Sequence, residues 1–233
     1  MWRMIKDFFC HFKLTSALYK KMFTIKERRR KQNVRKNLDK NGKNVLFSIY
    51  HDFTRGGIPF FFDMGTMLGI VREGRIISHD LDIDLGVMGY FGRQNEFVEK
   101  LSELGYKHVL RFVDSDNQVI EDSFSKLGIK FDVHYYRQEG DKMYCCICFR
   151  PPQKEFNYNE YEIVSLWCDT VTDMIDFPVY DASLPVPENY EKLLSQKYGE
   201  NWRIPDKNWK YWLGPNATIV PNAIGKRVEI IDN

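Results

Sequence analysis

The stretch GTMLGIVREGRIISHDLDIDLGV, residues 65–87, ends in three aspartates that alternate with apolar residues. A strand directs alternate side chains to opposite faces, so Asp80, Asp82 and Asp84 are expected on one face, with the apolar residues turned to the core. Like charges this close repel unless a cation lies between them, and the pattern therefore predicts a metal site. Oxygen ligands favour Mg²⁺ or Mn²⁺. An acidic surface strand and a calcium loop are the structural alternatives.

A glycine opens this stretch shortly after a short apolar run. Residues 58–62 are apolar and bounded by turn-forming residues, which predicts a buried strand, and a short helix is expected from Gly65 through Arg72. Gly65 and Thr66 lie at the start of that helix, where the backbone can approach a ligand and exposed N–H groups can bind phosphate. Arg72 and Arg75 follow shortly and can neutralise the same phosphate. An ordinary tight turn is the simpler explanation of the glycine.

A third acid comes from a later segment, GIKFDVHYY, residues 128–136. Its β-branched and aromatic residues predict a strand, and Asp132 on it could complete the metal site or accept the proton of an attacking hydroxyl. Lys130 and His134 share the face of Asp132, because each is two residues away. Lys130 is a candidate phosphate ligand, His134 a candidate acceptor contact and His79 a candidate site residue, with a structural or solvated histidine as the alternative.

From residue 44 onward the periodicity alternates between helix and strand, which indicates an α+β fold. Helices are expected at residues 45–54, 91–104 and 188–198, and strands at residues 106–113, 118–124 and 128–136. We expect three parts: a basic amphipathic helical arm (1–43), a catalytic core (44–150) and a C-terminal segment packed on that core (151–233).

Together these motifs resemble the LicD/fukutin family, a branch of the nucleotidyltransferase superfamily. Residues 65–87 resemble its GTLLGxxRxxxxIPWDxDxDI signature without a gap, and KFDVHYY, residues 130–136, is similar to its later acidic strand. Residues 184–202 are similar to its closing segment with a YG pair. Residues 78–79, Ser-His, replace the family's Pro-Trp pair, a departure that changes the wall of the substrate pocket and leaves the acids intact.

The resemblance implies a nucleotidyltransferase-like α+β fold, with a mixed β-sheet flanked by helices and preceded here by the basic arm. It also implies residue roles: Asp82 and Asp84 would bind the metal, Asp132 would be the third acid, and Gly65, Thr66 and Arg72 would contact phosphate.

The resemblance also implies an activity. Members of the family move a phospho-alcohol, such as phosphocholine, glycerol phosphate or ribitol phosphate, from a CDP-activated donor to a sugar hydroxyl. In the bacterial cases the acceptor glycan is a teichoic acid, a lipopolysaccharide or a capsule. The implied reaction is in-line attack on phosphorus, with CMP leaving and a metal neutralising phosphate charge. Two alternatives stay open: a nucleotidyltransferase that moves NMP to a small-molecule hydroxyl, and a non-catalytic protein that keeps the fold to bind a membrane or partner.

The arm differs from the rest of the chain in charge. Residues 1–43 carry 14 Lys and Arg against three acids, a net charge of +11, which leaves −9 for residues 44–233. Bulky apolar residues recur in the arm near helical spacing: Ile5, Phe8, Phe9, Phe12, Leu18, Tyr19, Met22 and Phe23. Such a helix suits an anionic membrane surface, and packing on the body or on another subunit of a homo-oligomer is the alternative. Nucleic acid is not expected as a partner, because the acidic body would oppose it.

The sequence shows no apolar run of 18 residues and no signal-peptide pattern. The five cysteines form no recognisable disulfide framework, and buried reduced thiols are favoured over a zinc site. We therefore expect a cytoplasmic protein, which the arm could attach peripherally to the inner face of the cell membrane.

Overall fold

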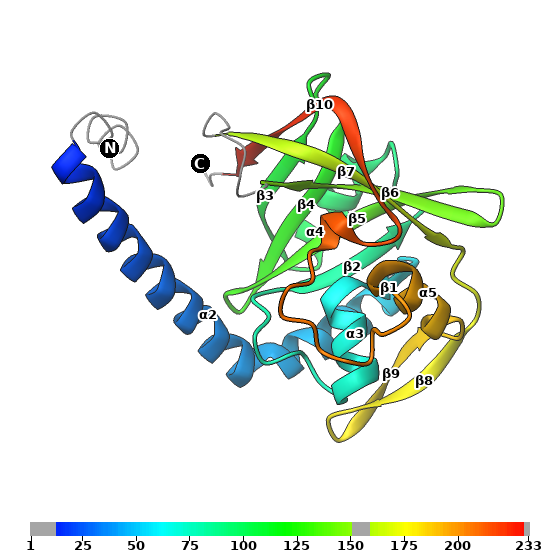
Figure 1. Ribbon diagram of the computed structural model, residues 1–233. Helices are drawn as coiled ribbons and strands as arrows, with labels where there is room; N and C mark the ends of the chain where they lie inside the picture. The colour runs from blue at the N-terminus through cyan, green and yellow to red at the C-terminus, as the bar shows by residue number, and fades with distance from the viewer. Residues whose placement is uncertain (1–12, 151–158, 231–233) are drawn as a thin grey trace.

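The structure, a computed structural model, describes residues 13–150 and 159–230 (Figure 1). Its helices are α2 (Lys13–Arg55), α3 (Met64–Glu73), α4 (Gln94–Glu103) and α5 (Tyr190–Tyr198), with a short 3₁₀ helix η1 (Tyr211–Leu213). Its strands are β1 (Phe60–Phe62), β2 (Ile83–Met88), β3 (Lys107–Val113), β4 (Val119–Lys126), β5 (Ile129–Glu139), β6 (Lys142–Phe149), β7 (Glu160–Asp169), β8 (Met174–Val179), β9 (Ala182–Pro187) and β10 (Ala217–Glu229). Helices flank a large mixed sheet, which confirms the predicted α+β fold.

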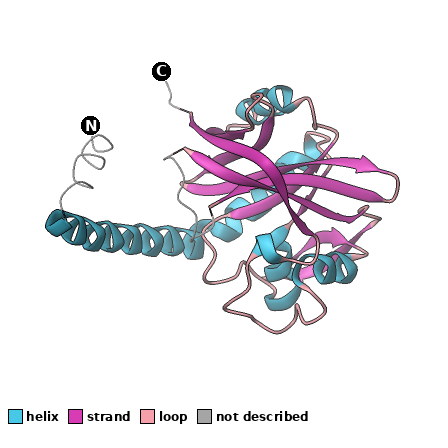
Figure 2. Ribbon diagram, turned by 45° about the horizontal axis from the view of Figure 1, so that its top comes forward, coloured by secondary structure: helices cyan, strands magenta, loops and turns pink. Residues whose placement is uncertain are grey.

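An eight-stranded sheet in the order β1-β2-β5-β4-β3-β10-β7-β6 dominates the fold (Figure 2). β2 and β5 run parallel, whereas their other neighbours in the sheet are antiparallel. β6 also pairs with β5, so the strands from β5 through β6 form a closed ring of pairings and the sheet curls on itself. β8 and β9 form a separate hairpin. The parallel pair β2 and β5 brings the two acidic segments of the sequence side by side.

Side chains of the central strands alternate between two faces of the sheet. On one face Phe62, Leu85 and Val133 are buried in a core that also contains apolar residues of α2 and α4. Because neighbouring residues of a strand point in opposite directions, Asp84 of β2 and Asp132 of β5 point to the other face. A second core, with residues of α3 and α5, lies on that face. The acids therefore project beside α3 and α5.

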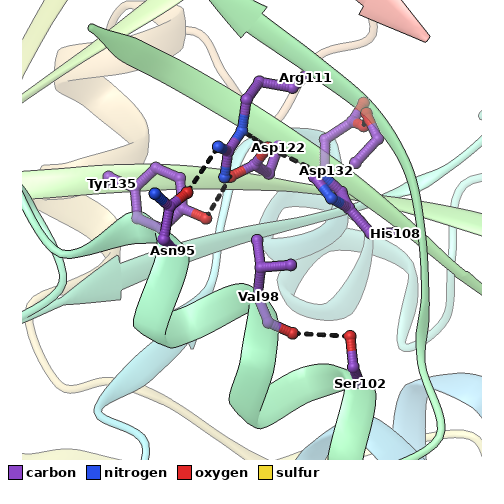
Figure 3. A network of polar contacts seen from close by, with 9 residues as sticks. Asn95, Val98, Ser102, His108, Arg111, Asp122, Asp132 and Tyr135 are labelled. Carbon is purple, nitrogen blue, oxygen red and sulfur yellow. Dashed lines mark hydrogen bonds and ion pairs between the residues drawn. The ribbon is translucent and has the colours of Figure 1, made fainter. Parts of the chain in front are cut away.

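A buried polar network ties β3, β4 and β5 to α4 (Figure 3). Asp122 is fully buried and accepts two hydrogen bonds from Arg111, at 2.7 and 2.9 Å. The Tyr135 hydroxyl donates to it at 2.7 Å, and His108 Nε2 lies 2.8 Å from it. Arg111 also donates to Asn95 of α4 at 2.7 Å. Burial raises the pKa of Asp122, but the hydrogen bonds from His108 and Arg111 outweigh it and lower that pKa.

α2 is one continuous helix of 43 residues, and its first half projects away from the body (Figures 1 and 2). Met22 and Ile25 are 55% and 43% exposed. The second half contacts the body: Arg35 donates to the His79 carbonyl at 3.3 Å, and Leu38 is buried. The helix runs without interruption through residue 43, where the sequence suggested the border between arm and core.

The structure leaves the membrane interpretation of the arm as a prediction. Ile5, Phe8, Phe9 and Phe12 lie outside the described residues, and of Leu18, Tyr19 and Phe23 only the helical backbone is described. In the described part of the chain, none of the helices has an apolar segment of the length needed to cross a membrane.

The C-terminal part contributes more to the sheet than the sequence predicts. The helix expected at residues 188–198 is α5, but the strands β7 and β10 were not expected, and they lie between β3 and β6 in the main sheet. The helix expected at 91–104 is shorter, because a turn closed by a hydrogen bond from the Arg93 N–H to the Tyr90 carbonyl precedes α4. Cys145 and Cys168 are buried free thiols, as predicted, whereas the free thiols of Cys146 and Cys148 are only partly buried and Cys10 lies outside the described residues.

Candidate active site and metal centre

Asp82, Asp84 and Asp132 form an acidic cluster. Asp84 of β2 lies directly opposite Asp132 of β5 in the parallel register. Asp82 immediately precedes β2, and one carboxylate oxygen from each aspartate lies within 4.8 Å of the others. Among the described residues, this is the only group of three or more acids, histidines or cysteines close enough together to hold a metal ion.

Asp80 belongs to the wall of the site but not to this group of three. The expectation that Asp80, Asp82 and Asp84 all lie on one strand is wrong, because β2 begins at Ile83 and the chain before it forms a turn. Asp80 Oδ2 lies close to Gly65. A Cβ atom at position 65 would lie 3.2 Å from Asp80 Oδ2 and 3.6 Å from Asp84 Oδ2, so a glycine leaves room for both carboxylates.

Lys130 neutralises part of the cluster. Its ammonium lies 3.1 Å from Asp82 Oδ2 and also pairs with Asp132, whose other oxygen accepts a hydrogen bond from the Ser123 hydroxyl. Burial raises the pKa of Asp132, but Lys130 outweighs it and lowers that pKa. Burial raises the pKa of Asp82 despite Lys130, and burial together with Asp82 raises the pKa of Asp84 well above its usual range. Three carboxylates thus share one ammonium, and the raised pKa values of Asp82 and Asp84 indicate that their charged forms are disfavoured unless a cation lies between them.

The first turn of α3 is hydrogen-bonded to the backbone of the strand that carries Asp84. Thr66 is fully buried, and its Oγ1 accepts a hydrogen bond of 2.8 Å from the Asp84 N–H. The Asp63 N–H donates to the Asp84 carbonyl at 3.0 Å. Between them Met64 has a φ of 44°, a left-handed conformation that is uncommon outside glycine. The hydroxyl of Thr66 is therefore engaged with the backbone, whereas Gly65 faces the cavity in front.

A buried chain of charges links α5 to the site. Asp63 is fully buried, with Lys197 Nζ 2.7 Å from Oδ1, the Tyr136 hydroxyl donating to Oδ2 at 2.7 Å and His134 Nδ1 3.8 Å from Oδ2. Burial raises the pKa of Asp63, but Lys197 and His134 hold it well below its usual range. Burial lowers the pKa of His134, but Asp63 and Asp84 outweigh it and raise that pKa to about 9. His134 therefore places a positive charge beside the aspartates at neutral pH.

Glu121 also lines the acidic site, and the sequence did not single it out. It lies in β4 opposite His134 and is buried. Burial raises its pKa to about 7, with Asp132 adding to the effect and His134 opposing it. The pairing of β4 with β5 places it there, because Glu121 shares a face with Ser123, which lies opposite Asp132.

Two adjoining cavities open at the site. The acidic cluster lines a cavity of about 360 Å³, together with Glu121 and His134. A larger cavity of about 570 Å³ is lined by Arg72, His79 and most of residues 198–209. The residues common to both cavities are Gly65, Asp80, Tyr198 and Trp209. The two cavities therefore form one cleft with an acidic end.

The two predicted arginines differ in position. Arg72 lines the larger cavity and pairs with Glu73 at 3.0 Å. Arg75 is 59% exposed, lies 3.9 Å from Glu73 and lines neither cavity. The structure thus brings Arg72 to the cleft and leaves Arg75 outside it.

The profile of the LicD/FKTN/FKRP nucleotidyltransferase domain matches residues 57–189, more than half of the chain. The chain belongs to this family. It is 27% identical to the ribitol-5-phosphate transferase FKTN of Homo sapiens over 188 residues, which are 79% of this chain and 38% of that protein. It is 28% identical to FKTN of Mus musculus over 171 residues, which are 72% of this chain and 34% of that protein. The chain therefore spans well under half the length of these relatives.

The LicD/FKTN/FKRP match confirms the family predicted from the sequence and contains the acidic cluster, Gly65, Thr66 and Arg72. Residues 198–209, which form most of the wall of the larger cavity, lie beyond the matched range.

The residues of this LicD/FKTN/FKRP member fit a hard divalent cation. All candidate ligands are carboxylate oxygens, they converge within 4.8 Å, and burial together with mutual repulsion raises the pKa of Asp84. The acidic cluster could therefore hold a metal ion.

Proposed function

We propose that the chain is a divalent-metal-dependent phosphotransferase that moves a phospho-alcohol from a CDP-activated donor to a sugar hydroxyl of a cell-surface glycan. The observation that carries the proposal is the cluster of Asp82, Asp84 and Asp132, within the segment that matches the LicD/FKTN/FKRP nucleotidyltransferase domain. The printed name of the human relative makes ribitol 5-phosphate the first group to test, ahead of glycerol phosphate and phosphocholine. Lipopolysaccharide, capsule and teichoic acid are the acceptor glycans to test.

Asp82, Asp84 and Asp132 would hold Mg²⁺ or Mn²⁺. Such an ion, when bound, supplies positive charge that stabilises the transferred phosphate and the leaving CMP. The protein adds positive charge of its own, because Lys130 lies against two of the aspartates and Asp63 outweighs burial to raise the pKa of His134. Preorganised charges of this kind usually contribute most of the acceleration of phosphoryl transfer.

The transfer forms a bond between the acceptor oxygen and phosphorus and breaks the bond from phosphorus to the CMP oxygen. The proton of the attacking hydroxyl passes to a carboxylate, for which Asp132 and Glu121 are the candidates. Lys130 outweighs burial and lowers the pKa of Asp132, which makes this carboxylate a poor proton acceptor and favours a ligand role. Glu121 lines the same cavity and is the second candidate for the proton.

Product analysis tests this function. The full chain is incubated with Mg²⁺, a glycan acceptor and CDP-ribitol, CDP-glycerol or CDP-choline, and the nucleotide products are separated by chromatography. We expect release of CMP with transfer of the phospho-alcohol. A nucleotidyltransferase that moves NMP would instead release pyrophosphate from a nucleoside triphosphate, and a non-catalytic protein would turn over none of these donors.

We also propose that α2 brings the protein to an anionic membrane, at the inner face of the cell membrane. Residues 24–43 carry nine Lys and Arg against two acids, and most of these side chains are exposed. Each such charge near an anionic surface contributes roughly 1 kcal/mol. An acceptor on a lipid carrier would then be met at the membrane. Packing against a second subunit is the alternative.

A further inference from the structure

The larger cavity extends the acidic cleft into a part of the chain that the transfer step leaves unused. It adjoins the acidic cavity through Asp80, Tyr198 and Trp209. Its volume of about 570 Å³ lies within the range of ligand pockets, roughly 300–1,000 Å³. A ligand in this cavity would have one end at the aspartates.

Aromatic rings form the wall of this cavity. The rings of Trp209 and Tyr198 lie 4.4 Å apart at an angle of 36°. Trp202 is only 4% exposed, and the Arg203 guanidinium lies 4.1 Å from its ring centre. Backbone hydrogen bonds within the loop, such as that from the Trp202 N–H to the Gly199 carbonyl at 3.1 Å, hold these rings in place. Trp202 is thus part of the support, whereas the half-buried Trp209 has a flat apolar face that suits the C–H face of a sugar ring or a nucleobase.

The polar groups of the wall distinguish between these two ligands. Glu200 and Asp206 line the cavity, and ionised carboxylates only accept hydrogen bonds, whereas the Asn201 amide both donates and accepts. The cationic Arg72 is already paired with Glu73 at 3.0 Å. Sugar hydroxyls supply many donors, but the pairing edge of cytosine offers mainly acceptors and one amino group. The excess of carboxylates therefore favours a neutral polyhydroxyl ligand over a base or a phosphate.

We propose that this cavity is the acceptor subsite, which binds a glycosyl unit against Trp209 and directs one of its hydroxyls to the acidic cluster. The proposal rests on the proposed phosphotransferase function and adds to it the place and the chemistry of the acceptor. The phosphate of the donor then lies at the aspartates, and the two substrates meet where Asp80, Tyr198 and Trp209 line both cavities.

Saturation-transfer NMR on the full chain with Mg²⁺ tests the subsite without turnover. One probe is a set of methyl glycosides of hexoses and N-acetylhexosamines, and the other is CMP. The variants are Trp209→Leu and Glu200→Gln, with Trp167→Leu as the matched control, because Trp167 lies in β7 and lines neither cavity. Trp209→Phe keeps an aromatic ring and serves as the conservative variant, and circular dichroism checks folding.

We expect the wild type and Trp167→Leu to bind the glycosides equally well. Trp209→Leu should weaken glycoside binding at least about tenfold, and Trp209→Phe should restore part of it. CMP binding should be the same in all of these proteins. A wild type that binds no glycoside, or glycoside binding that neither Trp209→Leu nor Glu200→Gln weakens, overturns the proposal. So does a Trp209→Leu variant that loses CMP but keeps the glycoside, because the cavity would then be the nucleoside site. Absence of CMP binding in the wild type counts instead against the phosphotransferase function, while the glycoside result still decides the subsite.

Discussion

Thr66 Oγ1 accepts a hydrogen bond of 2.8 Å from the backbone N–H of Asp84, so the first turn of α3 fixes the strand that carries the acid. Thr66 is fully buried, and water cannot replace this bond. An unpaired buried N–H costs about 1–3 kcal/mol. The side chain of Thr66 thus contributes to both the stability of the fold and the position of Asp84.

The variant Thr66→Val keeps the shape of the side chain and removes the acceptor. We expect it to lower the free energy of unfolding by about 1–3 kcal/mol and to reduce turnover. Thr66→Ser retains the hydroxyl and should keep most of both. Urea unfolding and steady-state kinetics measure the two effects. A valine variant equal to the wild type in both would show that this bond does not position the acid.

Asp84→Asn tests the acidic cluster. Burial and Asp82 raise the pKa of Asp84 well above its usual range, so removal of the charge relieves repulsion and should leave the free energy of unfolding at pH 7 unchanged or higher. We expect kcat to fall by more than about 10³-fold and Mn²⁺ binding, followed by electron paramagnetic resonance, to weaken. Asp176→Asn, on an exposed position of β8, is the control. Near-normal turnover of Asp84→Asn at saturating Mg²⁺ would contradict the metal assignment.

A pair of variants separates the roles of Asp132 and Glu121. Because Lys130 outweighs burial and lowers the pKa of Asp132, we expect this residue to act as a ligand, and Asp132→Asn to weaken Mn²⁺ binding and to lower kcat together. We expect Glu121→Gln to lower kcat by about 10²-fold, the usual contribution of general base catalysis, with Mn²⁺ and donor binding retained. The opposite result would make Asp132 the base: a lower kcat in Asp132→Asn alone, with the Mn²⁺ affinity of that variant unchanged.

The sequence predicted the acidic cluster well because its signal is local. Asp82 and Asp84 lie two residues apart in one motif, and Asp132 lies in a strand with clear β-branched and aromatic neighbours. Asp80 was misplaced because the alternation of a strand was assumed to continue backward into a turn. The strand starts where the pairing of β2 with β5 begins, at Ile83, and this pairing is not visible in the sequence.

Glu121 and the strands after residue 150 could not be predicted in the same way. In β4 the acids Glu121 and Asp122 are neighbours, so one faces the cleft and the other the core, and the sequence does not show which. β10 contains Pro221 and Gly225 and has an irregular register, features typical of loops. Its pairing with β3 and β7 is long-range, and local propensity does not carry that information.

The Asp122 network predicts a dependence of stability on pH. Hydrogen bonds from His108 and Arg111 lower the pKa of Asp122 below its unfolded value of about 3.9, so its stabilisation is fully present above that value and is lost as the pH falls toward the folded pKa. Asp122→Asn also leaves a partly buried Arg111 without its counter-ion, which should cost about 3–5 kcal/mol at pH 7. Urea unfolding between pH 7 and 3 measures the difference in unfolding free energy between the wild type and the variant. This difference should be constant above about pH 5 and should decrease below about pH 4. A gap that does not change with pH would contradict the ion pair.

The last prediction concerns the exposed part of α2 and is tested by flotation with liposomes. Arg28, Arg29, Arg30 and Lys31 are exposed, and four charges near an anionic surface contribute on the order of 4 kcal/mol, which suffices for reversible binding. We expect the full chain to bind anionic but not neutral vesicles, with binding weakened by salt, and a variant with these four residues changed to Gln to stay free. The four changes avoid Leu38 and Arg35, which contact the body, whereas deletion of residues 1–43 would remove them. The variant should therefore unfold at the same urea concentration and turn over a soluble acceptor as well as the wild type does. Equal flotation of the variant and the wild type on anionic vesicles would contradict the membrane role and leave packing against a second subunit as the role of α2. Sedimentation of the two proteins without lipid would then show a difference in mass.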